Sequence, residues 1–178
     1  MNTSLKTVIA ICGSTKASST NLILIKSIKE LAKDQFDIIL FEGLTDIPHF
    51  NPDLDTETPP AAVTNFRQAL RNADGILICT PEYAMGVPGT LKNAIDWTVS
   101  SMEFSHKPVA LITASSLGQK GHASLLETLK VIEASMVPET QLLISFVKTK
   151  VNNEGITDEA VKAKVLELIS ALNKLMED

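Results

Sequence analysis

Hydroxyl, amide and ammonium groups crowd one short stretch near the start of the chain, residues 13–21. An uninterrupted apolar run at residues 8–12 precedes the stretch, and apolar residues three to four positions apart follow it, as on one face of a helix. A polar loop between a buried strand and a helix N-terminus suits an anion, because the first N–H groups of a helix lack partners within it. The stretch therefore predicts a site for a phosphate monoester, and an ordinary N-cap cluster is the alternative.

The candidate phosphate ligands in this loop are Gly13, Ser14, Lys16, Ser19, Thr20 and Asn21. A Walker A loop would end in Gly-Lys-Ser/Thr, whereas Ala17 follows Lys16. The dinucleotide fingerprint would need three spaced glycines, and this loop has one. We therefore expect side-chain O–H groups to bind the phosphate alongside backbone N–H groups.

The composition is that of a globular chain with an acidic balance. At 178 residues, with 44% hydrophobic and 21% charged residues, we expect a single domain over residues 1–178. The net charge of −5, with no basic cluster, argues against a nucleic-acid partner. The N-terminus is polar, and no apolar run approaches the roughly 20 residues of a membrane span. We expect a cytoplasmic protein without a membrane partner.

Two cysteines and three histidines are the remaining reactive side chains. Cys12 and Cys79 each lie near the end of an apolar run, so a redox pair is one interpretation and two buried free thiols are the simpler one. We predict the second. The histidines, His49, His106 and His122, lack the spacing of metal ligands, and we predict no metal site.

Buried-strand runs alternate with helical patterns along the whole chain. We predict strands at residues 8–12, 36–41, 75–80, 109–113 and 141–147, and helices at 22–33, 60–72, 90–101, 122–136 and from Thr157 as N-cap. This alternation specifies an α/β sandwich around a parallel sheet of order 2-1-3-4-5. Three polar loops, at residues 13–21, 81–89 and 114–121, then converge at the switch point of the sheet, where we expect the site.

These three loops resemble the motifs of the NADPH-dependent FMN reductases, a flavodoxin-like family that includes quinone and chromate reductases. The first loop matches Gly-Ser-x-Arg-x-x-Ser-x-Asn, with Lys16 in place of the arginine. The second has Pro-Glu-Tyr at residues 81–83, Pro-Gly at 88–89 and Leu-Lys-Asn-Ala-Ile-Asp-Trp at 91–97. The third matches Ser-x-Gly-x-x-Gly through Ser116, Gly118 and Gly121.

The resemblance implies a flavodoxin-like three-layer fold, bound FMN, and NADPH or NADH as hydride donor. The acceptor would be a small molecule such as a quinone, free flavin or a metal oxyanion. The first loop would hold the FMN phosphate, and the further cofactor-binding candidates are Pro81, Glu82, Tyr83, Ala84, Ser115, Ser116 and Gly118. No side chain is predicted to be catalytic, because the flavin carries the chemistry. The family also implies a homodimer, or a dimer of dimers.

The chain departs from the family pattern at Lys16, Ala84, Gly86 and His122, which bears on flavin affinity and substrate range rather than on the fold. Two other functions stay open at this point. One is an electron carrier, although such proteins are typically more acidic. The other is a regulatory protein that has lost its flavin.

Trp97 is the only tryptophan, and the helical pattern places it about 200° around from the apolar stripe of Leu91, Ala94, Ile95 and Met102. Two partners could cover it, a symmetry mate in a homodimer or the long irregular segment at residues 42–60. We favour the symmetry mate.

Overall fold

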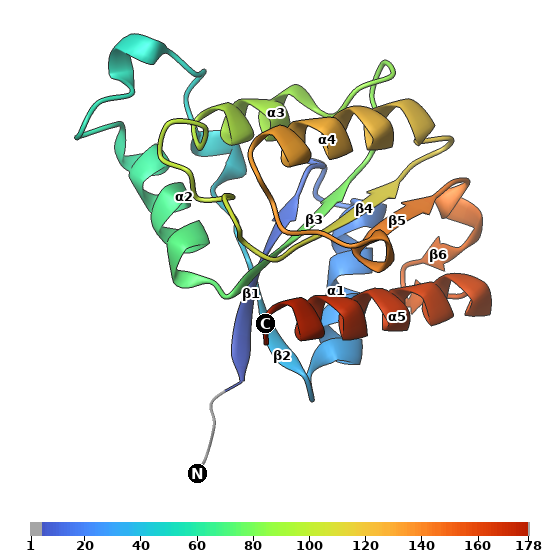
Figure 1. Ribbon diagram of the computed structural model, residues 1–178. Coiled ribbons are helices and arrows are strands. Elements are labelled where there is room, and N and C mark those ends of the chain that lie inside the picture. Colours follow the sequence, from blue (N-terminus) through green and yellow to red (C-terminus); the bar gives the residue numbers. More distant parts are fainter. Residues whose placement is uncertain (1–4, 178) are drawn as a thin grey trace.

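The computed structural model describes residues 5–177, in which strands and helices alternate as the sequence predicts (Figure 1). The main elements are β1 (Lys6–Cys12), α1 (Thr20–Ala32), β2 (Phe36–Leu40), α2 (Ala61–Asn72), β3 (Gly75–Thr80), α3 (Gly89–Asp96), β4 (Val109–Ala114), α4 (Gln119–Val131), β5 (Gln141–Ile144) and α5 (Glu159–Leu175). Smaller elements are the β6 (Val151–Asn152) and β7 (Gly155–Ile156) hairpin and the 3-10 turns η1 (Leu44–Asp46), η2 (Pro52–Leu54), η3 (Pro138–Thr140) and η4 (Val147–Thr149).

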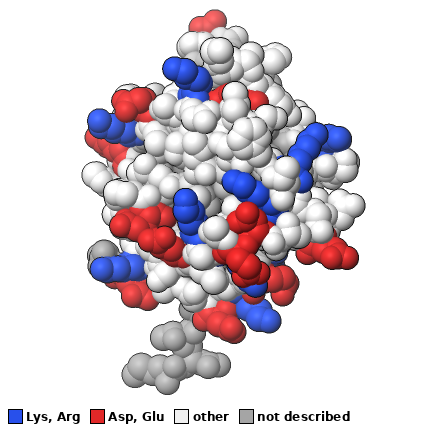
Figure 2. Space-filling model, turned by 90° about the vertical axis from the view of Figure 1, so that its right-hand side faces the viewer, with Lys and Arg blue, Asp and Glu red and all other residues white. Residues whose placement is uncertain are grey.

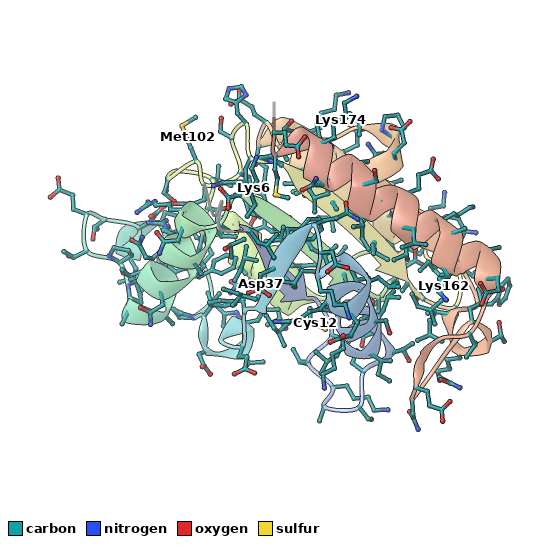
Figure 3. All side chains as sticks on the ribbon, turned by 90° about the horizontal axis from the view of Figure 1, so that it is seen from below. Lys6, Cys12, Asp37, Met102, Lys162 and Lys174 are labelled. Carbon is teal, nitrogen blue, oxygen red and sulfur yellow. The ribbon has the colours of Figure 1, made fainter. Side chains whose placement is uncertain are left out.

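The five long strands form one parallel sheet in the order β2-β1-β3-β4-β5, so the predicted flavodoxin-like α/β fold is confirmed. Helices α1 and α5 cover one face, and α2, α3 and α4 cover the other (Figure 1). Helix α5 crosses its face of the sheet, with Lys162 and Lys174 toward its two ends (Figure 3). Strands β3 and β4 are buried at every position, as expected for central strands covered on both faces.

Several element boundaries differ from the prediction. Strand β5 ends at Ile144 rather than at residue 147, because Phe146 takes a left-handed conformation that turns the chain out of the sheet. Helix α3 ends at Asp96 rather than at residue 101, so Met102 does not continue its apolar stripe and is exposed. Helix α4 begins at Gln119 and ends at Val131, earlier than predicted at both ends. The N-cap of α5 is Asp158, whose carboxylate accepts the Val161 N–H at 2.9 Å, so the prediction of Thr157 is wrong by one residue. The β6–β7 hairpin was not predicted.

The long segment at residues 42–60 is held against α3 by polar contacts. The side-chain oxygen of Asn93 accepts the Phe50 N–H at 2.7 Å, and the Trp97 indole N–H donates to the Pro48 carbonyl at 2.8 Å. The Phe50 ring packs edge-on against Trp97 with centroids 5.1 Å apart. Trp97 is fully buried beneath this segment. The interpretation of Trp97 as a dimer contact is therefore wrong, because its partner lies in its own chain.

A buried arginine fixes the far end of the same segment. Arg67 of α2 donates to the Asp55 carboxylate at 2.7 Å and, through Nε, to the Trp97 carbonyl at 2.9 Å. The Ser100 hydroxyl donates to the other Asp55 oxygen at 2.5 Å. The side chains of Arg67 and Asp55 are only 7% and 10% exposed, so neither charge can be left alone without a large desolvation cost.

Charges on the surface are mixed. On the face shown in Figure 2, lysine and arginine side chains are interspersed with carboxylates, and across the described residues of that face no broad area carries one sign. Within residues 5–177, no helix combines the length and the apolar character needed to cross a bilayer.

We predict that Asp55→Asn lowers the free energy of unfolding at neutral pH by about 2–3 kcal/mol, because Arg67 loses its buried counter-charge. The hydrogen bond from Ser100, together with Arg67, lowers the pKa of Asp55 below its ordinary 3.8. A lowered pKa means that this stabilisation is complete above about pH 3.8 and is lost as the pH falls below it. Urea unfolding of wild type and variant at several pH values measures the difference.

The matched control is Asp53→Asn, which removes an exposed carboxylate from the same segment and should change stability by less than about 0.5 kcal/mol. Equal losses in the two variants would show that the Asp55–Arg67 pair has no special role.

Candidate functional site

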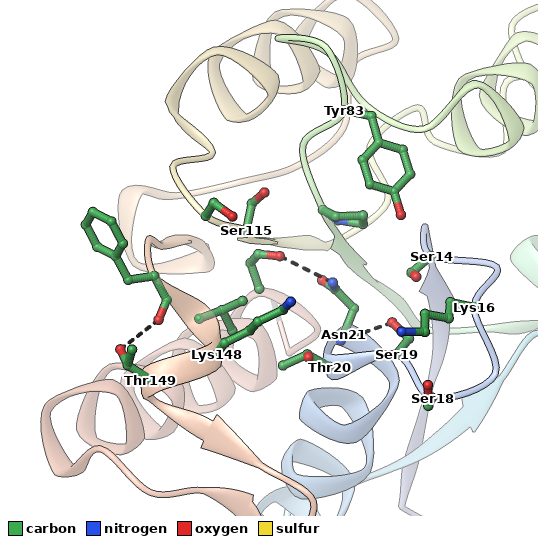
Figure 4. Close-up of a pocket in the computed structure, with 15 residues that line it drawn as sticks. Ser14, Lys16, Ser18, Ser19, Thr20, Asn21, Tyr83, Ser115, Lys148 and Thr149 are labelled. Atoms are coloured by element: carbon green, nitrogen blue, oxygen red, sulfur yellow. Dashed lines mark hydrogen bonds between the residues drawn. The ribbon is translucent and has the colours of Figure 1, made fainter.

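A cavity of about 400 Å³ opens where β1, β3, β4 and β5 end (Figure 4). Four segments form its wall: the loop after β1, the start of the loop after β3, the loop after β4 and the turn after β5. The lining residues are Ser14, Lys16, Ser18, Ser19, Thr20, Asn21, Pro81, Tyr83, Ala114, Ser115, Ser116, Phe146, Val147, Lys148 and Thr149. Its size is that of a small-molecule site.

The first loop reaches the cavity because β1 ends tightly against β3. The Gly13 N–H donates to the Cys79 carbonyl at 2.8 Å, and a Cβ on Gly13 would lie 2.3 Å from the Thr80 hydroxyl oxygen. Only glycine fits between the two strand ends. The chain then turns to start α1, whose N-cap is Ser19 with its hydroxyl accepting the Asn21 N–H at 3.2 Å. The first turn of α1 therefore faces the cavity with its N–H groups and hydroxyls.

Asn21 ties this loop to the centre of the sheet. Its amide donates to the Ala114 carbonyl at 3.3 Å, and its oxygen accepts the Cys79 thiol proton at 3.3 Å. Both bonds are buried and join residues far apart in sequence. Part of the bonding capacity of Asn21 is therefore used within the protein, and its side chain forms a fixed part of the wall.

The second and third loops are joined by Glu82. Its carboxylate accepts the Gly121 N–H at 2.7 Å, in the first turn of α4, where the helix dipole favours a negative charge. A Cβ on Gly121 would lie 2.9 Å from the Gly86 carbonyl oxygen, so the loops touch closely there. Gly118, with φ of 95°, begins α4 in the left-handed region and has no side chain to cap the helix. Glu82 supplies that cap from the neighbouring loop.

The tip of the second loop is a tight turn. Tyr83 and Gly86 exchange both backbone hydrogen bonds at 2.9 Å, and the two residues between them have positive φ, 48° at Ala84 and 63° at Met85. This is the geometry of a type I′ turn, in which Asn and Gly are preferred. Neither residue here is of the preferred type, so the turn is strained.

The structure gathers most of the predicted site residues around the cavity. Those that line it are Ser14, Lys16, Ser19, Thr20, Asn21, Pro81, Tyr83, Ser115 and Ser116. Gly13, Glu82, Ala84 and Gly118 lie outside the lining and shape the loops instead. The turn at residues 146–149 is not among the predicted site residues, because the apolar run at residues 141–147 predicts an unbroken strand there. Its position at the carboxyl end of the last strand could have identified it, because ligands of such sheets bind at the carboxyl ends of the strands.

The cavity is positively charged in an acidic chain. Among the described residues that line it, Lys16 and Lys148 are the charged ones, and carboxylates are absent from that set. The cavity is surrounded by hydroxyls, two ammonium groups and a helix N-terminus. This set of hydrogen-bond donors fits a phosphate monoester. The residues present therefore fit the phosphate end of FMN.

The cysteines lie side by side in register, Cys12 opposite Cys79 on the neighbouring strands β1 and β3. Both are free thiols, and burial raises the pKa of each above its ordinary value of 9.0. Thiols with raised pKa values are poor nucleophiles. His122 also lies behind the wall, its Nδ1 2.9 Å from the Thr113 hydroxyl, and burial lowers its pKa.

A parallel sheet of this order, with a phosphate-type cavity at its switch point, defines a flavodoxin-like nucleotide-binding protein. Residues 7–149 match the sequence model of the NADPH-dependent FMN reductases. The chain belongs to this family of oxidoreductases. The predicted family, the enzyme class and the cofactors FMN and NAD(P)H are confirmed.

Similar proteins span the same length. A quinone reductase of Escherichia coli strain K12 is 30% identical over 167 residues, covering 90% of this chain and 87% of its own. An NAD(P)H-dependent FMN reductase of Pseudomonas aeruginosa is 31% identical over 172 residues, covering 93% and 92%. Among solved structures, a flavoenzyme NAD(P)H:(acceptor) oxidoreductase from Paracoccus denitrificans superposes with a TM-score of 0.83 at 27% identity, over 97% of this chain and 98% of its own.

We predict that Ala84→Asn raises the free energy of unfolding by about 0.5–1 kcal/mol, because Asn tolerates the left-handed backbone at this position of a type I′ turn. Ala84→Val is the opposite control. A β-branched residue is disfavoured there, so this variant should be less stable than wild type. Thermal unfolding of the three proteins measures the order, and a more stable valine variant would contradict the assignment of strain to this turn.

Proposed function

We propose that the cavity holds FMN with its phosphate at the first loop, and that the enzyme passes hydride from NAD(P)H to a small acceptor. We infer that the acceptor is one of three kinds of small molecule: a quinone, free flavin or a metal oxyanion. The observation that supports this most directly is the cavity itself, in which hydroxyls, the start of α1 and two lysines surround one space at the switch point. When bound, FMN supplies the hydride chemistry.

The protein's part is to bind and orient. Ser14, Ser18 and Thr20 offer hydroxyl donors to the phosphate from around the start of α1. In the second loop, the N–H groups of Tyr83 and Gly86 bond within the turn, so the donors that remain at the tip are those of Ala84 and Met85. We propose that these two face the flavin edge. Because Glu82 holds this loop to α4, little ordering is needed when the flavin binds.

A stopped-flow experiment under anaerobic conditions tests the function. Protein loaded with FMN is mixed with NADPH or NADH, and we expect the visible flavin absorbance to bleach, then to return when a quinone is added. The rates for quinones, free flavin and chromate identify the acceptor class. Flavin that neither nicotinamide reduces would contradict the proposal.

We further propose that the protein is a cytoplasmic homodimer. NAD(P)H is a reductant of the cytoplasm, and the family resemblance implies a dimer. Trp97 provides no contact for one, but the exposed side chains of Val99, Met102 and Val131 line one shallow depression beside the ends of α3 and α4. Exposed apolar side chains gathered in this way are typical of protein contacts.

Sedimentation velocity tests the dimer. We expect Val131→Glu to raise the dissociation constant roughly tenfold or more, since it would place a carboxylate in the contact. The matched control is Leu166→Glu, which changes an exposed apolar residue of α5 on the opposite face and should remain dimeric. A wild-type protein that is monomeric at micromolar concentration while it oxidises NADPH would contradict the proposal.

A further inference from the structure

The turn after β5 has a backbone that its own sequence does not favour. Phe146 has φ of 54° and ψ of 40°, the left-handed region, which is rare for a bulky residue. The residue is 61% exposed, so burial does not offset the strain. Strain of this kind persists only where surrounding contacts impose it, and it gathers at functional sites.

Hydrogen bonds to the third loop impose this conformation. The N–H groups of Phe146 and Val147 donate to the carbonyls of Ser116 and Ser115, at 2.9 and 3.1 Å. The Ser145 hydroxyl donates to the Leu117 carbonyl at 2.6 Å. The turn and the third loop are therefore fixed to each other, and the direction in which the next residue, Lys148, leaves the chain is fixed with them.

Lys148 points into the cavity. Figure 4 shows its side chain extending toward Thr20 and Asn21 at the start of α1, while Lys16 lies on the other side of that helix end. Both lysines line the same cavity. The four ion pairs formed among residues 5–177 involve neither of them. Two ammonium groups without a partnered carboxylate thus flank one helix N-terminus.

We propose that Lys148 is a second cationic ligand of the FMN phosphate, acting opposite Lys16. A phosphate monoester carries about −1.5 to −2 charges at pH 7, which two lysines and a helix N-terminus match. Lys16 lacks the two-pronged donor of the arginine in the family motif, and Lys148 restores the missing interaction from a segment outside all three motifs. This inference rests on the proposed function, since it assigns a residue to that site.

Binding of FMN and of riboflavin, which lacks the phosphate, separates this role from a structural one. We expect Lys148→Gln to weaken FMN binding about 5- to 30-fold at low salt, with a smaller loss at high salt. Riboflavin affinity should be unchanged. The matched control is Lys150→Gln. It removes the same charge two residues further along the chain, and Lys150 does not line the cavity, so this variant should bind FMN like wild type.

Four results would overturn the proposal. Unchanged FMN affinity in Lys148→Gln, or an equal loss for riboflavin, would exclude a contact with the phosphate. An equal loss in Lys150→Gln would show a general effect of charge. A raised KM for NADPH, with FMN affinity and the KM for NADH unchanged, would assign Lys148 to the 2′-phosphate of NADPH instead. In each case wild-type FMN binding and reduction would still support the proposed function, whereas a wild type that binds no FMN would end both.

Discussion

The tight contact between the ends of β1 and β3 is the constraint on which the site depends. The absence of a side chain at Gly13 lets β1 end directly against Thr80, and the Gly13 N–H bonds to Cys79. The loops after these two neighbouring strands then leave the same edge of the sheet and lead to helices on opposite faces, α1 after β1 and α3 after β3. A larger residue at this point would push the strand ends apart. The cavity lies where the two loops diverge.

Once the strand ends are in place, the loops fix one another. Glu82 caps α4 from the second loop, Asn21 joins the first loop to Cys79 and Ala114, and Ser116 holds the turn after β5. Each bond joins segments far apart in sequence, so no loop can shift alone. A site built in this way is ordered before the ligand arrives, which lowers the entropy lost on binding. The strained conformation of Phe146 is held by the bond to Ser116, and that of Ala84 and Met85 by the backbone pair between Tyr83 and Gly86.

The segment at residues 42–60 packs on the face of the sheet that α2, α3 and α4 cover. Its contacts with Arg67, Asn93 and Trp97 bury one ion pair and the Trp97 ring beside α2 and α3. This packing has a consequence for assembly. The tryptophan that would serve as a typical hot spot is already buried within the chain, so any contact between copies must use other side chains.

The sequence by itself determined the order of strands and helices and the chemistry of the three loops. Apolar runs bounded by polar loops are local patterns, and a short alternation of strands and helices admits few arrangements. Only the tertiary structure decided what covers Trp97, which bonds Asn21 uses and where Lys148 points. A helical pattern indicates the direction of a side chain but not its neighbour. The carbonyl that accepts the indole N–H of Trp97 belongs to Pro48, 49 residues away. Lys148 reaches the cavity because bonds from the third loop hold Phe146 in a conformation that its own sequence disfavours.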